Sequence, residues 1–97
     1  MDRFQEKIEK TIEICKIELQ RRKEGIFGES TEKQLEGTIL PELYNLLTFV
    51  KNEEVLDKQD RYLNSFANAF TVWGWNMQTP TELFVLLAEL NNDYKNL

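Results

Sequence analysis

The sequence predicts an all-α fold, a compact four-helix bundle or four-helix array built by one domain over residues 1–97. Four stretches carry apolar residues at the three- and four-residue spacing of a helix that is buried on one side. Glycine occurs four times and proline twice, with 41% hydrophobic and 30% charged residues, as in an ordinary globular protein rich in helix formers. Short segments separate the four stretches, as expected for neighbouring helices of a bundle.

The first helix is expected over residues 2–24, and Gly25 stands where a glycine would end it. Its apolar stripe consists of Phe4, Ile8, Ile12, Cys15 and Leu19. Ile14 and Ile17 lie off this stripe, so they either widen the buried face or form a second contact. After Gly25, we expect Ile26 and Phe27 to tuck under the neighbouring helices.

The second helix is expected over residues 31–52, with Ser30 or Thr31 as its N-cap. Its apolar stripe consists of Leu35, Ile39, Leu43, Leu46, Leu47 and Val50, and it continues through Pro41. A proline inside a helix clashes with the carbonyl four residues earlier, which belongs here to Gly37. The sequence therefore favours one helix that is kinked near Gly37 and Pro41. The competing interpretation is two helices, with Pro41 at the first position of the second.

The third helix is expected to follow the polar segment 52–59, opened by Asp57 or Asp60. Its apolar stripe consists of Leu63, Phe66, Ala67, Phe70, Trp73 and Met77. Val72 and Trp75 fall outside this stripe. Either the helix unwinds at Gly74 and Trp75 folds back over the bundle, or these two residues form an exposed apolar patch. In the second case, the off-stripe residues Phe84 and Val85 would extend the patch.

The fourth helix is expected to begin with a capping box, in which Thr79 is the N-cap, Pro80 the first residue and Glu82 the third. Its apolar stripe consists of Leu83, Leu86, Leu87, Leu90, Tyr94 and Leu97.

The residue types present exclude most catalytic chemistry. The chain has no histidine, and its single cysteine, Cys15, lies on an apolar stripe. The four glycines do not form a phosphate-binding loop. We therefore expect no catalytic residue, no metal ligand and no cofactor.

One carboxylate pattern is an exception to this exclusion. Glu53, Glu54 and Asp57 resemble the E-E-x-x-E pattern of the MazG-type nucleotide pyrophosphohydrolases, with aspartate as the last acid. The later E-x-x-D pattern of that family is missing, because Glu89 and Asp93 are four residues apart. A Mg-dependent nucleotide pyrophosphohydrolase is thus the least favoured alternative.

The net charge of −5 lies in the middle of the chain. Between residues 29 and 60, three lysines stand against eight acidic residues, which leaves −5 in this segment alone. Such a charge favours a cationic partner and argues against nucleic acid. The longest apolar run, residues 84–88, is too short for a membrane span, and the charged N-terminal segment does not resemble a signal peptide. We expect a cytoplasmic protein.

The segments ELQRRKEGIFGES and RYLNSFANAFTVWGWN, together with the acidic region 29–60, give the chain a general resemblance to the immunity proteins of bacterial toxin systems. These systems include contact-dependent growth inhibition, other polymorphic toxins and the helical colicin immunity proteins. The resemblance implies a non-enzymatic protein that binds and neutralises a cognate, basic bacterial toxin such as a nuclease. The alternative is a helical interaction or regulatory module that acts as a homodimer.

The expected partner-binding residues are the acids of the middle segment and the off-stripe tryptophan. They are Glu29, Glu32, Glu36, Glu53, Glu54, Asp57, Asp60 and Trp75.

Overall fold

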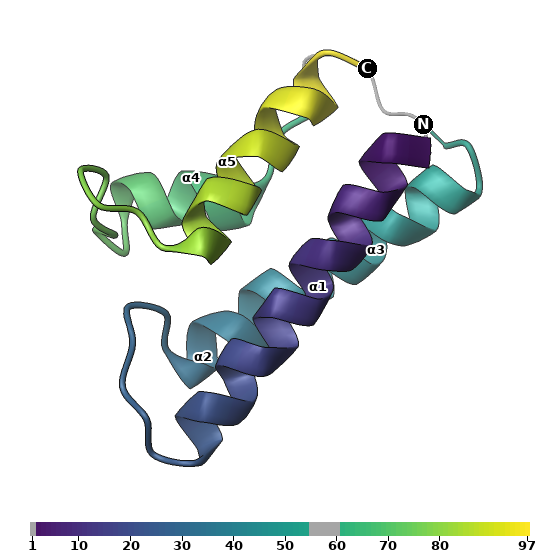
Figure 1. Cartoon of the computed structure of the whole chain (residues 1–97). Helices are drawn as coiled ribbons and strands as arrows, with labels where there is room; N and C mark the ends of the chain where they lie inside the picture. The colour runs from purple at the N-terminus through teal and green to yellow at the C-terminus, as the bar shows by residue number, and fades with distance from the viewer. Residues whose placement is uncertain (1, 55–60) are drawn as a thin grey trace.

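The computed structural model describes residues 2–54 and 61–97, and over these residues the fold is all-α (Figure 1). Helix α1 spans Asp2–Lys23, α2 Glu32–Gln34, the π-helical turn η1 Leu35–Ile39, α3 Leu40–Lys51, α4 Asn64–Thr71 and α5 Glu82–Lys95. The segments α2, η1 and α3 follow one another without a break, so the described chain forms four helices, as predicted. Its radius of gyration is 13.1 Å, close to the ~13 Å typical of a compact 100-residue domain.

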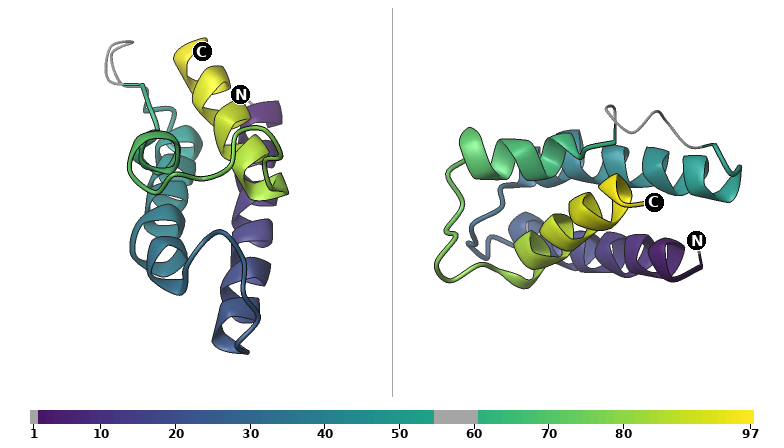
Figure 2. Two further views of the ribbon diagram at one scale, coloured as in Figure 1. Left: turned by 90° about the vertical axis from the view of Figure 1, so that its left-hand side faces the viewer. Right: turned by 90° about the horizontal axis from the view of Figure 1, so that it is seen from above.

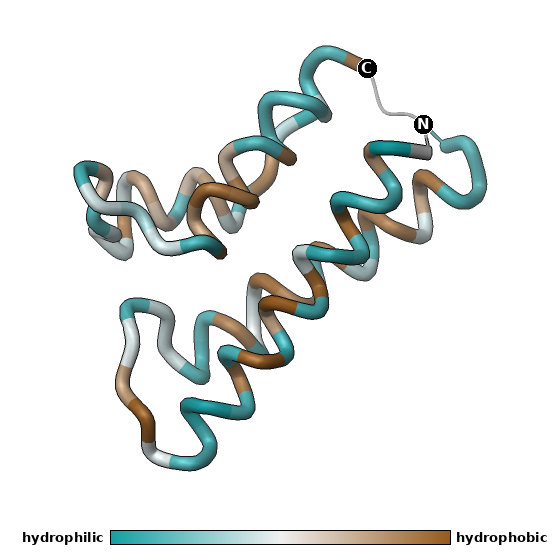
Figure 3. Tube along the Cα trace, viewed as in Figure 1, coloured by the Kyte–Doolittle hydropathy of each residue, from teal (hydrophilic) through white to brown (hydrophobic). Residues whose placement is uncertain are grey.

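Helix α1 packs against two other helices of the bundle. It lies alongside the α2–α3 helix on one side and against α5 on another (Figures 1 and 2). Its predicted stripe is buried at Phe4, Ile8, Ile12 and Cys15, and hydrophobic residues recur turn by turn along α1, α3 and α5 (Figure 3). The Lys7 ammonium, 2.8 Å from an Asp93 carboxylate oxygen, adds a polar tie between α1 and α5.

The second helix is continuous through Pro41, and its irregularity takes the form of a π turn. Thr31 is the N-cap and forms a capping box with Gln34. At the end of the π turn, the Leu40 N–H donates to the Leu35 carbonyl five residues earlier. Pro41 has no N–H, and its ring crowds the carbonyl of Gly37. The wider π turn, which comes directly before the proline-containing turn, is where the helix departs from α geometry.

The third helix is shorter than predicted, and its apolar stripe is only partly correct. Its proposed first residues, Asp57 and Asp60, lie outside the described residues. Leu63 is buried as expected, but Phe70 and Met77 are 49% and 56% exposed. Within α4 the buried residues are Ser65 and Ala69, so Phe70 lies on the exposed side of the helix. Because α4 ends at Thr71, Met77 no longer follows the helical period.

Trp75 is buried, with only 4% of its surface exposed. The chain leaves the helix after Val72, Gly74 adopts φ +65°, and the Trp75 N–H donates to the Ala69 carbonyl at 3.0 Å. Trp75 thus folds back over the bundle, as one of the two interpretations expected. The exposed patch of the other interpretation is wrong, because Phe84 is buried as well.

The fourth helix begins two residues later than predicted. Its N-cap is Thr81, whose Oγ1 accepts a hydrogen bond from the Phe84 N–H at 3.2 Å. Pro80 therefore precedes the helix, and Glu82 belongs to its first turn without closing a capping box on Thr79. The predicted stripe is buried from Leu83 to Tyr94, and only Leu97, beyond the helix end, is exposed. Among the described helices, none has both the length and the apolar character that a bilayer span requires.

Candidate protein-binding site

The acidic residues predicted to bind a partner do not form one surface. Glu32 and Glu36 are exposed at the start of the second helix, whereas Glu53 and Glu54 are exposed beyond its end. Residues 32–51 form a helix about 30 Å long at 1.5 Å per residue. Asp57 and Asp60 lie outside the described residues.

Two of the predicted partner-binding residues are occupied within the fold. One carboxylate oxygen of Glu29 accepts a hydrogen bond from the Asn76 N–H at 2.7 Å, which ties the loop after α1 to the loop after α4. Trp75 is the second, and its burial makes it unavailable as an exposed anchor. Of the predicted acids near the start of the second helix, only Glu32 and Glu36 are therefore exposed and free of such a contact.

The loop of residues 24–31, which we call the Phe27 loop, is held by the guanidinium of Arg22. Arg22 donates from Nε to the Ser30 carbonyl at 2.5 Å, from Nη2 to the Ser30 hydroxyl at 3.3 Å and from Nη1 to the Ile26 carbonyl at 3.4 Å. Glu18 pairs with the same guanidinium at 2.8 Å. A Cβ atom added at Gly28 would lie 1.9 Å from Arg22 Nη2, so a larger residue there would have to displace the guanidinium from its present position.

This arrangement leaves Phe27 exposed, contrary to the prediction that it tucks under the helices. Its side chain is 98% exposed, and Ile26 and Ile17 beside it are about half exposed. The loop is too short to bring Phe27 back to the core while Arg22 holds both of its arms. Sequence reasoning missed this surface, although one signal was present: Ile26 and Phe27 are bracketed by Gly25 and Gly28.

Two hollows of about 290 Å³ each flank the Phe27 loop. One is bounded by α1, the loop and the start of α5, and Ile14, Ile17 and Thr81 are among its lining residues. The other lies toward the second helix and is lined by Ile26, Phe27 and Glu32 among others. An apolar anchor and a carboxylate thus share one surface.

A second apolar surface lies between α4 and α5, and we call it the α4–α5 groove. It encloses about 290 Å³ and is almost entirely apolar. Its lining residues are Phe66, Phe70, Met77, Pro80, Phe84, Val85, Ala88 and Glu89. The exposed Phe70 and Met77, which the sequence placed in the core, belong to it.

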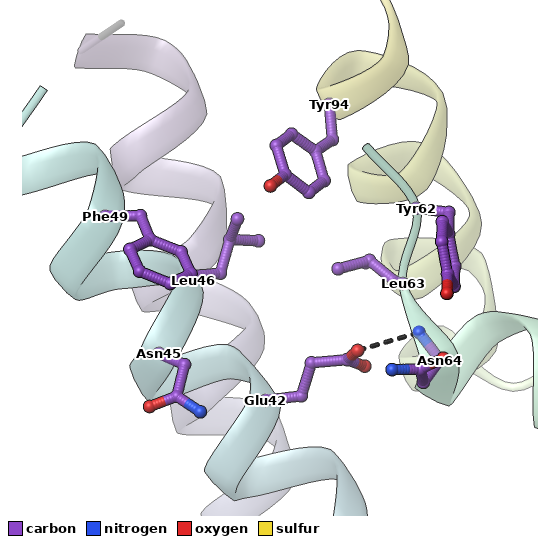
Figure 4. A pocket seen from close by; sticks show the side chains of 8 residues that line it. All are labelled: Glu42, Asn45, Leu46, Phe49, Tyr62, Leu63, Asn64 and Tyr94. Carbon is purple, nitrogen blue, oxygen red and sulfur yellow. Dashed lines mark hydrogen bonds between the residues drawn. The ribbon is translucent and has the colours of Figure 1, made fainter. Parts of the chain in front are cut away.

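A third site, which we call the Glu42 pocket, is lined by both polar and apolar side chains (Figure 4). It encloses about 350 Å³ between α3, the segment before α4 and α5. Its lining residues are Glu42, Asn45, Leu46, Phe49, Tyr62, Leu63, Asn64 and Tyr94. The Glu42 carboxylate reaches across from α3 to the start of α4, where its two oxygens accept from the Asn64 N–H at 2.7 Å and the Ser65 N–H at 2.7 Å.

The described residues contain no cluster of three or more Cys, Asp or Glu side chains that could hold a metal ion. The pattern that resembles the pyrophosphohydrolases ends at Asp57, outside the described residues. Cys15 is buried in the core, and burial, with a smaller contribution from Glu18, raises the pKa of its thiol to about 12. A thiol so strongly protonated at neutral pH suits a core residue and not a nucleophile.

Comparisons of the chain with models of protein families, with curated proteins and with solved structures found no match.

Proposed function

We propose that this chain is a non-enzymatic inhibitor of the immunity-protein type, which binds and neutralises a cognate basic bacterial toxin through the Phe27 loop. Phe27 would be the apolar anchor, and Glu32 and Glu36 would supply charge contacts. The observation that carries the proposal is the full exposure of Phe27 on a loop held by Arg22.

The energetics of protein interfaces support this role for the loop. Burying an aromatic side chain of this size stabilises a protein by about 1.5–3 kcal/mol. Because Phe27 is exposed, this free energy does not contribute to folding and is available on binding. Because the hydrogen bonds of Arg22 hold the loop in place before any partner binds, less conformational entropy is lost on association. Anchors of this kind dominate the binding energy of many interfaces.

Charge supports a cationic partner. Glu32 lines the same hollow as Phe27, and Glu36 follows one helical turn later on the exposed side. Neither carboxylate forms an ion pair with another described residue. Charge complementarity of this kind accelerates association and makes it sensitive to salt.

The test begins with photo-cross-linking in a bacterial host, with p-benzoylphenylalanine in place of Phe27. Val72, which is 71% exposed and lies on the α4 side of the molecule, is the matched control position. We expect position 27, and not position 72, to capture one basic protein. Growth inhibition by that protein should be relieved when the present chain is co-expressed.

Binding of the captured protein is then measured with purified components at low and high salt. Phe27→Ala should weaken the affinity by about thirtyfold or more, as expected for an interface hot spot. Glu32→Lys with Glu36→Lys should slow association, whereas Glu53→Lys with Glu54→Lys should change it little. The proposal is wrong if Phe27→Ala leaves the affinity within twofold of the wild type.

A second candidate function is a homodimeric interaction module, and the α4–α5 groove favours it. Val85, which is exposed at this groove, is a better test position than Trp75, whose replacement would disturb the core. Sedimentation at about 100 μM should show a dimer that Val85→Lys dissociates, since a charge in an apolar interface is costly. A wild-type monomer at this concentration would exclude the module.

A further inference from the structure

The Glu42 carboxylate is a fixed negative charge without a counter-ion among the described residues. It accepts hydrogen bonds from the Asn64 N–H, the Ser65 N–H and the Ser65 hydroxyl, the last at 2.6 Å. All three donors are neutral, and Glu42 forms no ion pair within residues 2–54 and 61–97. The donors orient the carboxylate and, with the positive end of the α4 dipole, stabilise its charge without neutralising it.

Aromatic rings and amides share the pocket with this carboxylate. Figure 4 shows the Tyr94 ring directed from α5 toward α3, whereas Glu42 reaches from α3 toward α4 lower in the same view. The ring of Phe4 stacks on Tyr94 with the centroids 6.0 Å apart, which fixes the orientation of Tyr94. Phe49 and the half-exposed Tyr62 also line the pocket, so aromatic side chains from α3, from α5 and from the segment before α4 border it.

The lining residues select one class of ligand. No lysine or arginine is among the described residues that line the pocket, and the Glu42 carboxylate, which already accepts from the N–H groups at the start of α4, would repel an anion. A hard metal ion is also disfavoured, because Mg²⁺ and Ca²⁺ need several oxygen ligands and the pocket has a single carboxylate, whose two oxygens already accept hydrogen bonds, among the described lining residues. A carboxylate beside aromatic rings is the environment that recognises organic cations.

We propose that the Glu42 pocket binds an organic cation, an alkylammonium or guanidinium group, with Glu42 as the counter-ion and Tyr62 and Tyr94 as the aromatic walls. The pocket volume of about 350 Å³ falls within the range of small-molecule sites, roughly 300–1,000 Å³. None of its lining residues belongs to the Phe27 loop, so this proposal is independent of the proposed function. The same group could belong to a free metabolite or to a lysine or arginine side chain of a protein.

The experiment is an amide NMR titration of the full chain with choline, with methylguanidinium and with the uncharged choline analogue 3,3-dimethylbutan-1-ol. We expect saturable shifts at Asn64, Ser65 and Tyr62 with at least one of the two cations, and none with the uncharged analogue. Glu42→Gln, which keeps the shape of the side chain and removes its charge, should weaken binding about tenfold or more. Tyr62→Leu should weaken it less, by about threefold, because Tyr62 is only one of the walls.

Capped peptides that contain a single lysine or arginine distinguish the two sources of the cation. Tighter binding of a peptide than of the free cations would identify a protein side chain, and weaker binding a small molecule. Both results support the cation pocket. No saturable shift with either free cation up to about 50 mM, or equal binding of the uncharged analogue, would overturn it. If Glu42→Gln does not fold, the uncharged analogue and Tyr62→Leu still test the proposal. Tyr62→Leu should fold, because the Tyr62 side chain is half exposed.

Discussion

Trp75 closes the end of the α4–α5 hairpin. Its ring lies 5.5 Å from that of Trp73 and meets the Phe84 ring edge-on at 5.5 Å, both measured between centroids. Edge-on aromatic contacts add to the gain from burial. One residue outside any helix thus joins the loop after α4 to the core face of α5.

Replacing Trp75 should therefore destabilise the whole domain. We expect Trp75→Ala to lower the free energy of unfolding by about 3–5 kcal/mol, the range for a large aromatic removed from a core. A domain of this size has about 5–15 kcal/mol in total, so the variant should be close to unfolding. Urea denaturation followed by far-ultraviolet circular dichroism measures the loss.

Val72→Ala provides the control for this measurement. Val72 is three residues away and exposed, so its replacement should change the stability by no more than about 0.5 kcal/mol. Equal effects at the two positions would contradict the buried placement of Trp75.

At the scale of elements, α4 depends on a residue of another helix for its N-terminal cap. Leu63 occupies the N-cap position but has no side-chain acceptor, and the free N–H groups of the first turn bind Glu42 instead. The negative charge of Glu42 also interacts favourably with the positive end of the α4 dipole. The N-terminal end of α4 is therefore capped by a residue of α3 and not by its own sequence.

A double-mutant cycle between Glu42 and Ser65 tests this cap. Glu42→Ala should cost about 2 kcal/mol, because hydrogen bonds to a charged group are lost and two N–H groups lose their acceptor. Ser65→Ala removes only the hydroxyl bond, which is one of the three. We expect a coupling free energy of about 1 kcal/mol from chemical denaturation. Strict additivity would show that the two side chains do not interact in solution.

Replacing Gly37 and replacing Gly28 by alanine should have opposite effects on stability. Gly37 lies in the π turn with open space around its added Cβ, so Gly37→Ala should stabilise the protein by about 0.5–1 kcal/mol through reduced freedom of the unfolded chain. Gly28→Ala should destabilise it, because the new Cβ displaces the Arg22 guanidinium that holds the Phe27 loop. Thermal unfolding of the two variants should shift in opposite directions. A rise in melting temperature for Gly28→Ala would contradict the role of Arg22.

At the scale of the whole molecule, α1 is the helix against which both the second helix and α5 pack. Cys15 lies on its buried face, within a cluster of described core residues to which α1, α3, α4 and α5 all contribute. A reagent reaches this thiol only when the bundle opens. The thiol is therefore an internal reporter of global unfolding.

Labelling of Cys15 by a thiol reagent at pH 8 should be slow in the native protein and should accelerate with urea in proportion to the unfolded fraction. The folded pKa of about 12 exceeds the ordinary value of 9.0, so the unfolded state loses its thiol proton first as the pH rises. Cys15 should thus lower the stability between about pH 9 and pH 12 and have no effect below that window. Cys15→Ala should remove this part of the alkaline loss. Rapid labelling at pH 8 without urea would contradict the buried placement.

The periodicity of the sequence was sufficient to predict the helices and most of the core. The stripes of α1, α3 and α5 are continuous over three or more turns, so the face that each helix buries follows from local spacing. The N-cap Thr31 and the irregularity before Pro41 follow equally from local rules, because both concern groups within a few residues of one another. The all-α class was therefore determined by the sequence alone.

The surfaces were decided by contacts between distant residues. The Phe27 loop depends on Arg22 reaching its far arm, the start of α4 on Glu42, and the burial of Trp75 on Phe84. Local spacing in the sequence placed Phe70 in the core, whereas α4 buries Ser65 and Ala69 instead, and it placed the exposed Phe27 under the neighbouring helices. It also treated the acids of one segment as one surface, although a helix of about 30 Å separates Glu32 from Glu53. The composition and local spacing of this chain determined what is helical and which faces are apolar, and only the tertiary packing decided which aromatic residues remain exposed.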